Sequence, residues 1–174
     1  QSRFEEALRE QAAYESDRIR FTLAPHAIYT CSPKLYRQAA EESEKRELLK
    51  TTHLSESVTE VEDSLKKYGK TPVAVLNETG FLDGSILAHC VQMRPGDLEL
   101  IKNAGATIVT NPASNAKLGN GFAPVTGFVE AGVNLCLGTD GTASNNTLNL
   151  FREMGLLSLI HKGIHADPTV LPAQ

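Results

Sequence analysis

The sequence predicts an α/β fold in which short parallel strands alternate with helices. Five apolar runs of strand length are each followed by a segment with helical spacing or helix-capping residues, which is the pattern of repeated βα units. The composition is globular, with 41% hydrophobic and 22% charged residues. We expect a single domain over residues 1–174, which is shorter than the roughly 250 residues of an eight-unit β/α barrel.

The first part of the chain should carry the solvated helices, because residues 1–70 hold 25 of the 38 charged side chains. Phe4 and Leu8 recur at helical spacing among Glu and Arg, which predicts an amphipathic surface helix over residues 1–19. The remaining residues carry few charges, so we expect them to be the more buried part.

Capping residues mark the later helices. Ser32 followed by Pro33 is a helix start, and Gly69 is a typical helix end. The expected helices, in chain order, cover residues 1–19, 33–48, 57–68, 95–103, 124–131 and, from a cap at Asn145 or Asn146, up to about 161. The expected strands are short apolar runs at residues 21–29, 48–53, 85–91, 107–110 and 134–137.

Several classes of protein are excluded by composition. No apolar stretch is long enough for a membrane span, and residues 1–20 lack the apolar centre of a signal peptide. A net charge of −4 without a basic cluster argues against a nucleic-acid partner. Cys31, Cys90 and Cys136 form no CxxC pair and cannot all pair together. We therefore expect a cytoplasmic protein whose cysteines pack as small apolar groups.

Polar side chains follow each expected strand. His26, His53 and His89 come after the first three strands, Asn111 and Asn115 after the fourth, and Asp140 after the fifth. In parallel β/α folds the carboxyl ends of the strands meet at one edge, where ligands bind. The sequence therefore predicts one convergent site at that edge.

Each of these residues also has a purely structural interpretation. His53 and Glu56 can form a metal ligand beside a proton donor, or a buried hydrogen bond and a charge at a helix N-terminus. His89 is either a hydrogen-bonded core histidine or a reactive one. Asp140 can bind a cation or take a proton, or it can close its own turn.

The loop TNPASNAKLGNG is expected to shape a pocket wall through Asn111, Ser114, Asn115 and Lys117. Its glycines do not follow a strand as GxGxxG, so it predicts no dinucleotide site. Two further histidines near the C-terminus are expected to face solvent, namely His161 and His165.

Five blocks of the sequence resemble the metal-dependent amidohydrolase superfamily, and within it most closely the 5-methylthioadenosine/S-adenosylhomocysteine deaminases and related chlorohydrolases. The resemblance runs from about residue 21 to the end, in the family's order and spacing. The blocks are PHAIYTCSP, THLSE, ILAHCV, TNPASNAKLGNGFAPV and LGTDGTASNNTLNLFREM. The resemblance implies a partial (β/α)8 TIM-type barrel that contains strands four to eight with their helices.

The resemblance also implies roles for five residues. His53 would bind a divalent metal, and Asp140 would bind the metal and accept a proton from its water. Glu56 would bind the purine and protonate its ring nitrogen, His89 would hydrogen-bond the attacking water, and His26 would reach the sugar. Zinc is the expected metal, with iron and manganese as alternatives. The reaction would convert adenine-type nucleosides to their inosine analogues with loss of ammonia.

One departure from the family is that the chain contains no HxH motif, which supplies two metal ligands in that family. His53 and Asp140 are only two protein ligands, whereas a zinc site usually has about three or four. We expect the chain alone to bind metal weakly and to be inactive until a missing N-terminal segment or a partner completes it. Such an open half-barrel would also form homo-oligomers.

Three other functions remain open at this point. Hydrolytic dechlorination of s-triazines and deamination of guanine would use the same activated water in a different pocket. A non-catalytic β/α domain that assembles through an exposed sheet edge is the alternative outside enzymes.

Overall fold

The computed structural model describes residues 3–172. Its centre is a sheet of five parallel strands in the order β1-β2-β3-β4-β5. The strands are β1 (Thr22–Leu23), β2 (Leu49–Leu54), β3 (Ile86–His89), β4 (Thr107–Thr110) and β5 (Asn134–Leu137). Because every strand pairs with the next one in sequence, the sheet has two open edges, at β1 and β5. The predicted α/β fold of successive βα units is confirmed.

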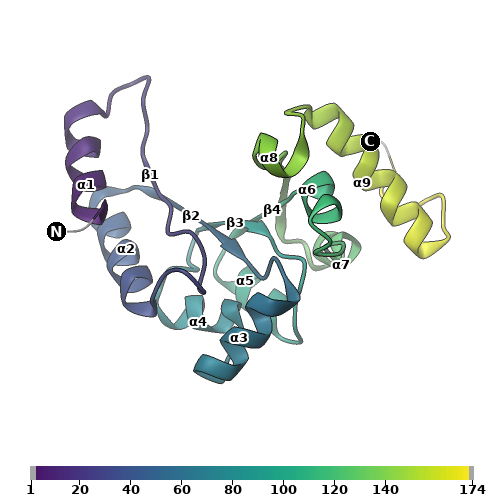
Figure 1. Cartoon of the computed structure of the whole chain (residues 1–174), viewed down its shortest axis with the longest axis horizontal. Helices are drawn as coiled ribbons and strands as arrows, with labels where there is room; N and C mark the ends of the chain where they lie inside the picture. Colours follow the sequence, from purple (N-terminus) through teal and green to yellow (C-terminus); the bar gives the residue numbers. More distant parts are fainter. Residues whose placement is uncertain (1–2, 173–174) are drawn as a thin grey trace.

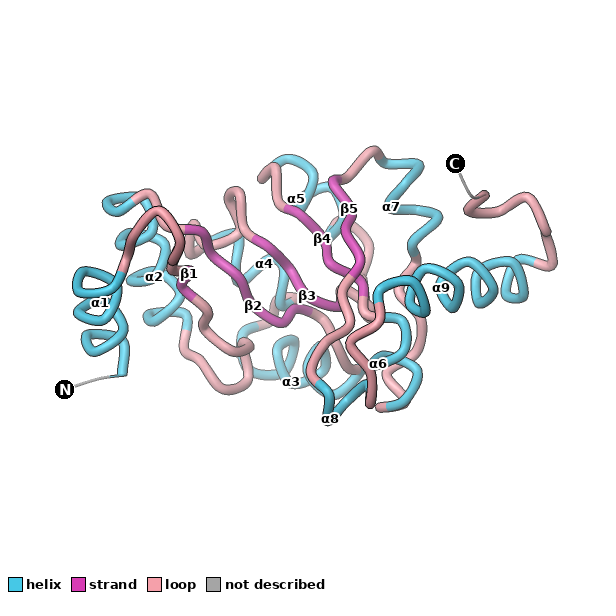
Figure 2. Tube along the Cα trace, turned by 90° about the horizontal axis from the view of Figure 1, so that it is seen from above, coloured by secondary structure: helices cyan, strands magenta, loops and turns pink. Residues whose placement is uncertain are grey.

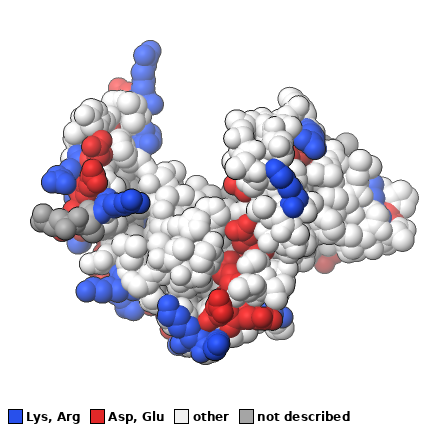
Figure 3. Space-filling model, viewed as in Figure 1, with Lys and Arg blue, Asp and Glu red and all other residues white. Residues whose placement is uncertain are grey.

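Helices cover the outer side of the sheet. The first helix, α1, and the last helix, α9, lie at its opposite ends (Figures 1 and 2). The helices are α1 (Arg3–Tyr14), α2 (Pro33–Arg46), α3 (Val58–Tyr68), α4 (Pro72–Glu78), α5 (Asp97–Asn103), α6 (Pro112–Lys117), α7 (Val125–Ala131), α8 (Thr142–Asn145) and α9 (Leu150–His165). Figure 3 shows a hollow between the two ends of the molecule.

Ser32 and Gly69, two of the capping residues predicted from sequence, start α2 and end α3 as expected. The hydroxyl of Ser32 accepts from the backbone N–H of Leu35, and the hydroxyl of Ser57 accepts from that of Glu60. Gly69 ends α3 at φ 68°, a conformation that costs glycine little.

Several element boundaries differ from the prediction. The first strand is far shorter than residues 21–29, because Pro25 has no N–H to donate to a ladder. The first helix ends at Tyr14 rather than at residue 19. The last helix begins after Asn149, whose side chain accepts from Arg152 N–H, and it extends to His165. Asn145 belongs instead to α8.

Besides α8, two short helices were not predicted. Thr71 caps α4 and Pro72 is its first residue, which is a start signal that the sequence contains. The loop around TNPASNAK forms α6, with Pro112 in its first turn. Both helices are short, so helical periodicity gives little signal for them.

The core lies between the sheet and the helices. Side chains from the middle strands are fully buried, including Leu54, Leu87 and Ile108. Tyr36 of α2 packs edge to face against Phe81, with ring centroids 4.9 Å apart. The Tyr36 hydroxyl also hydrogen-bonds that of Thr52 in β2 at 2.8 Å, which holds α2 against the sheet. Within residues 3–172, no helix has both the length and the apolar character that crossing a membrane requires.

Burial differs from the prediction near the C-terminus. Helix α9 is not a buried element, since Phe151 is 85% and Leu159 71% exposed. His161 was expected to face solvent but is 3% exposed, because it lies on the side of α9 turned toward the protein. His165 is exposed, as predicted. Cys90 is buried as predicted, whereas Cys136 on the open strand β5 is exposed.

Candidate metal and active site at the strand ends

Three of the predicted site residues converge at the carboxyl ends of the strands. Ligand atoms of His53, His89 and Asp140 all lie within 4.8 Å of one another. His53 and His89 belong to the neighbouring strands β2 and β3, but Asp140 follows β5. Strands separated by one neighbour would be roughly 10 Å apart in a flat sheet. The curvature of the sheet and the loop after β5 therefore bring the carboxylate to the two imidazoles.

His53 is oriented by its own strand and by the loop beside it. Its Nδ1 lies 3.0 Å from the backbone carbonyl oxygen of His26. Because a carbonyl only accepts, Nδ1 carries the proton and donates, and Nε2 has the free lone pair. This is the arrangement that metal-binding histidines adopt, with the second ring nitrogen bonded to a carbonyl.

The side chain of His26 is exposed and stands next to His53. Their ring centroids are 4.7 Å apart, and the His53 and His89 rings stack at 5.3 Å. The Nδ1 of His26 lies 2.9 Å from the hydroxyl of Thr30. The three imidazoles thus form a row that begins at the solvent and ends at the buried His89.

His89 is 1% exposed and ends β3 with φ 76°, in a region that non-glycine residues seldom adopt. Its Nδ1 lies 2.8 Å from Oδ1 of Asn115. Its Nε2 is 3.8 Å from Oε2 of Glu56. One ring nitrogen is therefore held by the protein, as in the structural interpretation, and the other faces the convergent site.

Glu56 is held by Asn120, in the loop after α6, and by Glu60, in the first turn of α3. Oε1 of Glu56 accepts a hydrogen bond of 2.9 Å from the side-chain amide of Asn120. The backbone N–H of Glu56 donates to Oε2 of Glu60 at 2.8 Å, and the backbone N–H of Ser55 donates to Oε1 of Glu60 at 3.0 Å. Helix α3 is capped by Ser57, so the Glu56 carboxylate does not cap that helix, and its Oε2 faces His89.

Glu60 is a buried acid, 2% exposed, at the first turn of α3. Burial raises its pKa to about 6, and the charge of Glu56 adds to this, although the bonds from backbone N–H groups oppose it. No local pattern of residues predicts the burial of Glu60, because a glutamate in a first helical turn is most often solvated.

Asp140 is surrounded by hydrogen-bond donors. Its Oδ2 accepts from the hydroxyls of Ser114 at 2.6 Å and Ser144 at 2.8 Å, and its Oδ1 accepts from Gly141 N–H at 2.7 Å. Burial by itself would raise its pKa, but these donated bonds outweigh it, so the pKa lies below the ordinary value. Asp140 closes its own turn through the bond from Gly141 N–H and also faces His53. Its structural interpretation as a turn residue is therefore compatible with its interpretation as a site residue.

Close packing at the end of β5 requires glycine. A Cβ atom on Gly138 would lie 2.4 Å from Oδ1 of Asn111 and 2.8 Å from Cγ1 of Val109. Both neighbours belong to β4 or directly follow it, so a side chain at this position would push the two strand ends apart. Gly138 therefore allows Asp140 to approach the site.

Three of the four residues that were expected to shape a pocket wall lie beside His89 or Asp140. Asn111, Ser114 and Asn115 are buried and contact His89 or Asp140. Lys117 instead donates to the carbonyl of Ala143 and to the side chain of Asn146. It fastens α6 to α8 and does not contact these site residues.

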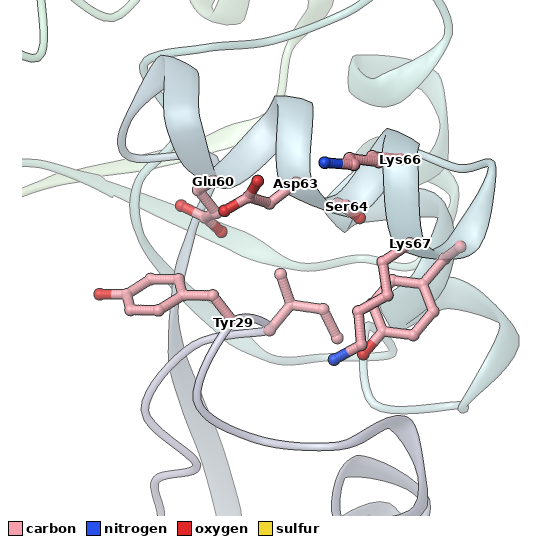
Figure 4. Close-up of a pocket in the computed structure, with 8 residues that line it drawn as sticks. Tyr29, Glu60, Asp63, Ser64, Lys66 and Lys67 are labelled. Carbon is pink, nitrogen blue, oxygen red and sulfur yellow. The ribbon is translucent and has the colours of Figure 1, made fainter.

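A separate cavity of about 420 Å³ lies beside α3. Figure 4 shows Tyr29 facing Glu60 and Asp63 across it, with Lys66 and Lys67 further along the helix. None of His53, His89 and Asp140 lines this cavity. It lies between the helix and the loop after β1 and is distinct from the convergent site.

Comparisons with known proteins agree with this geometry. The model of the Amidohydrolase family matches residues 2–173. A 5-methylthioadenosine/S-adenosylhomocysteine deaminase of Syntrophobacter fumaroxidans is 46% identical over 99% of this chain and 39% of its own length. The enzyme of the same name from Pyrococcus abyssi is 45% identical over 92% of the chain and 38% of its own length.

Solved structures show the same relationship. A zinc-bound adenosine deaminase from Xanthomonas campestris has a TM-score of 0.90 at 32% identity. The match covers 97% of this chain and 39% of the deaminase chain. Atrazine chlorohydrolase TrzN from Arthrobacter aurescens, complexed with zinc, has a TM-score of 0.88 at 27% identity, with 95% of this chain and 37% of its own covered. Guanine deaminase from C. acetobutylicum has a TM-score of 0.84 at 27% identity, with 93% and 41% covered.

The chain thus spans about two fifths of the length of the relatives it matches. The match extends over nearly all of its own residues, in sequence and in structure. The five-stranded sheet is accordingly part of a β/α barrel, as predicted, and the chain belongs to the amidohydrolase family.

Proposed function

We propose that this chain forms the later half of the active site of a metal-dependent hydrolytic deaminase of adenine-type nucleosides, such as 5-methylthioadenosine and S-adenosylhomocysteine. The observation that carries the proposal is the cluster of His53, His89 and Asp140 ligand atoms within 4.8 Å, with Glu56 3.8 Å from His89. The names of its relatives support the substrate class.

The donor set fits a divalent metal. His53 Nε2 and the carboxylate of Asp140 would hold it, and imidazole with carboxylate suits zinc, with iron and manganese as alternatives. The sequence has no HxH motif, so the remaining ligands would come from residues outside these 174. When bound, the metal makes hydroxide available near neutral pH by lowering the pKa of water.

The chain's own residues then have separate tasks. The carboxylate of Asp140 accepts a proton, and its three donors keep it ionised for this purpose. Nε2 of His89 faces the same point and orients the attacking water. Glu56, fixed by Asn120, protonates the purine ring nitrogen while the water oxygen adds to the adjacent carbon. The proton that Asp140 took from the water then passes to the amino group, which leaves as ammonia, and the carboxylate of Glu56 takes the remaining hydroxyl proton as the carbonyl forms. His26, at the solvent end of the row, hydrogen-bonds the sugar.

The test is an ultraviolet assay of adenosine-type deamination with added zinc. We expect no turnover of either nucleoside by residues 1–174 alone. We expect turnover by a longer protein that supplies an HxH segment, and its loss in His53→Ala and Asp140→Asn variants. Robust turnover by this chain alone would show that residues 1–174 suffice for catalysis. Failure of the longer, zinc-loaded protein on both nucleosides would reject the substrate class.

A second candidate is hydrolysis of s-triazines or guanine. The similarity to atrazine chlorohydrolase and guanine deaminase favours it. Glu56 as a proton donor to a ring nitrogen favours deamination. A panel of methylthioadenosine, guanine and atrazine on the longer protein separates the three, since the best substrate should exceed the others by at least about tenfold in kcat/KM.

A further inference from the structure

One carboxylate of helix α9, that of Glu153, is buried in the interior. The residue is 0% exposed, although α9 otherwise shows most of its apolar side chains to solvent. Burying a carboxylate is unfavourable unless hydrogen bonds compensate it. Its two oxygens have two donors: Ala113 N–H at 2.9 Å and the side-chain amide of Asn145 at 2.9 Å.

The first donor connects Glu153 to α6. Ala113 lies in the first turn of that helix. The next residue, Ser114, donates its hydroxyl to Oδ2 of Asp140 at 2.6 Å. A shift of the α6 start would therefore move a donor of the Asp140 carboxylate.

The second donor connects Glu153 to the loop after β5. The Asn145 amide nitrogen also donates to the carbonyl of Thr139 at 2.6 Å. Because the nitrogen has two acceptors and Oδ1 has no partner among the described residues, the orientation of this amide is determined. Thr139 directly precedes Asp140, whose backbone has φ 58°.

We propose that Glu153 is a positioning residue for Asp140. It joins the loop that carries Asp140 to the helix that carries the hydroxyl donor Ser114, so that side chain and backbone of the aspartate are fixed together. The importance of this for metal binding rests on the proposed function above. The positioning itself does not, because every contact that carries it lies within the described residues.

The experiment compares Glu153→Gln with the matched control Glu130→Gln, an exposed glutamate on α7. Amide hydrogen exchange is measured by NMR at Ala113, at Gly141, whose N–H donates to Asp140, and at Thr107, which bonds Ser85 far from the site. We expect exchange at Ala113 and Gly141 to rise about tenfold in Glu153→Gln, as for loss of a buried hydrogen bond. Thr107 should be unchanged, as should all three amides in the control.

A second variant, Asn145→Ala, removes only one connection and retains the bond to Ala113. Exchange should then rise at Gly141 and stay unchanged at Ala113. If Glu153→Gln alters Ala113 but leaves Gly141 unchanged, Glu153 only stabilises α6 and the proposal is overturned. An equal rise at Thr107 would also overturn it, because that is general destabilisation.

Zinc titration by calorimetry links the proposal to function. We expect about tenfold weaker zinc binding in Glu153→Gln, in the range seen when a partner of a metal ligand is removed. Zinc binding should be unchanged in the control Glu130→Gln. If the unaltered chain binds no zinc while the exchange pattern holds, the metal site loses support and the positioning of Asp140 stands.

Discussion

Oε2 of Glu56 lies 3.8 Å from Nε2 of His89, although the two residues leave different strands. Each partner is fastened on its other side by an asparagine, Asn120 for Glu56 and Asn115 for His89. Both asparagines lie in one segment, at the end of α6 and just after it. This segment therefore sets the distance between the acid and the imidazole.

Glu56→Gln should reduce deamination by the longer, zinc-loaded protein by at least about a hundredfold, because the amide cannot supply the ring proton. Zinc affinity should be unchanged, since Glu56 is not a proposed ligand. The rate is followed by ultraviolet absorbance and the affinity by calorimetry. Glu62→Gln, an exposed site on α3, is the control. Full activity of Glu56→Gln would remove this residue from the mechanism.

Asp140→Asn should weaken zinc binding by at least about tenfold, because the amide loses the charge that holds a cation. His53→Ala should do the same. His26→Ala is the control, because it retains the backbone carbonyl that accepts the hydrogen bond from His53 Nδ1. Equal zinc affinity for all three variants would place the metal elsewhere.

The stability of the chain should depend on Glu60 between about pH 4.5 and pH 6. Burial raises the pKa of Glu60 from 4.5 to about 6, so in this range the folded state binds more protons than the unfolded state. Its contribution is full below this window and is lost as the pH rises through it, by about 2 kcal/mol. Urea unfolding of Glu60→Gln should lack this part of the decline; identical pH profiles would contradict it.

Tyr36→Phe should lower the free energy of unfolding by about 1 kcal/mol, as for a buried neutral hydrogen bond. Thr52 uses its own proton toward the carbonyl of His26, so Tyr36 donates to the Thr52 hydroxyl at 2.8 Å. Urea denaturation measures the change. Tyr29→Phe serves as the control because Tyr29 is 53% exposed. An equal effect in both variants would show that the buried bond contributes nothing of its own.

The apolar side of α9 should make the chain self-associate in solution. Phe151 and Leu159 are largely exposed, as is Met154 at 57%, and exposed apolar groups of this kind favour association. Sedimentation velocity should show oligomers that Phe151→Glu with Leu159→Glu reduces. Leu65→Glu on α3 is the control. A monomer at every concentration would contradict this expectation.

Local signals explain the parts of the fold that the sequence predicted. Helix starts at Ser32 and Ser57 and the end at Gly69 depend on neighbouring residues only, so their pattern is readable from the chain. The polar residues after each strand were identifiable for the same reason. Boundaries failed where a single residue decides, as at Pro25, and at helices too short for periodicity.

The sequence by itself determined the alternation of the five strands with the longer helices, the family, and which side chains stand at the strand ends. The tertiary structure decided how closely Asp140 approaches His53 and His89, and it alone decided that Asn120 holds Glu56 and that a glutamate on the last helix supports the aspartate. These contacts join residues far apart in the chain, such as Asn120 and Glu56. They depend on the curvature of the sheet and the packing of helices on it, which no local pattern of residues specifies.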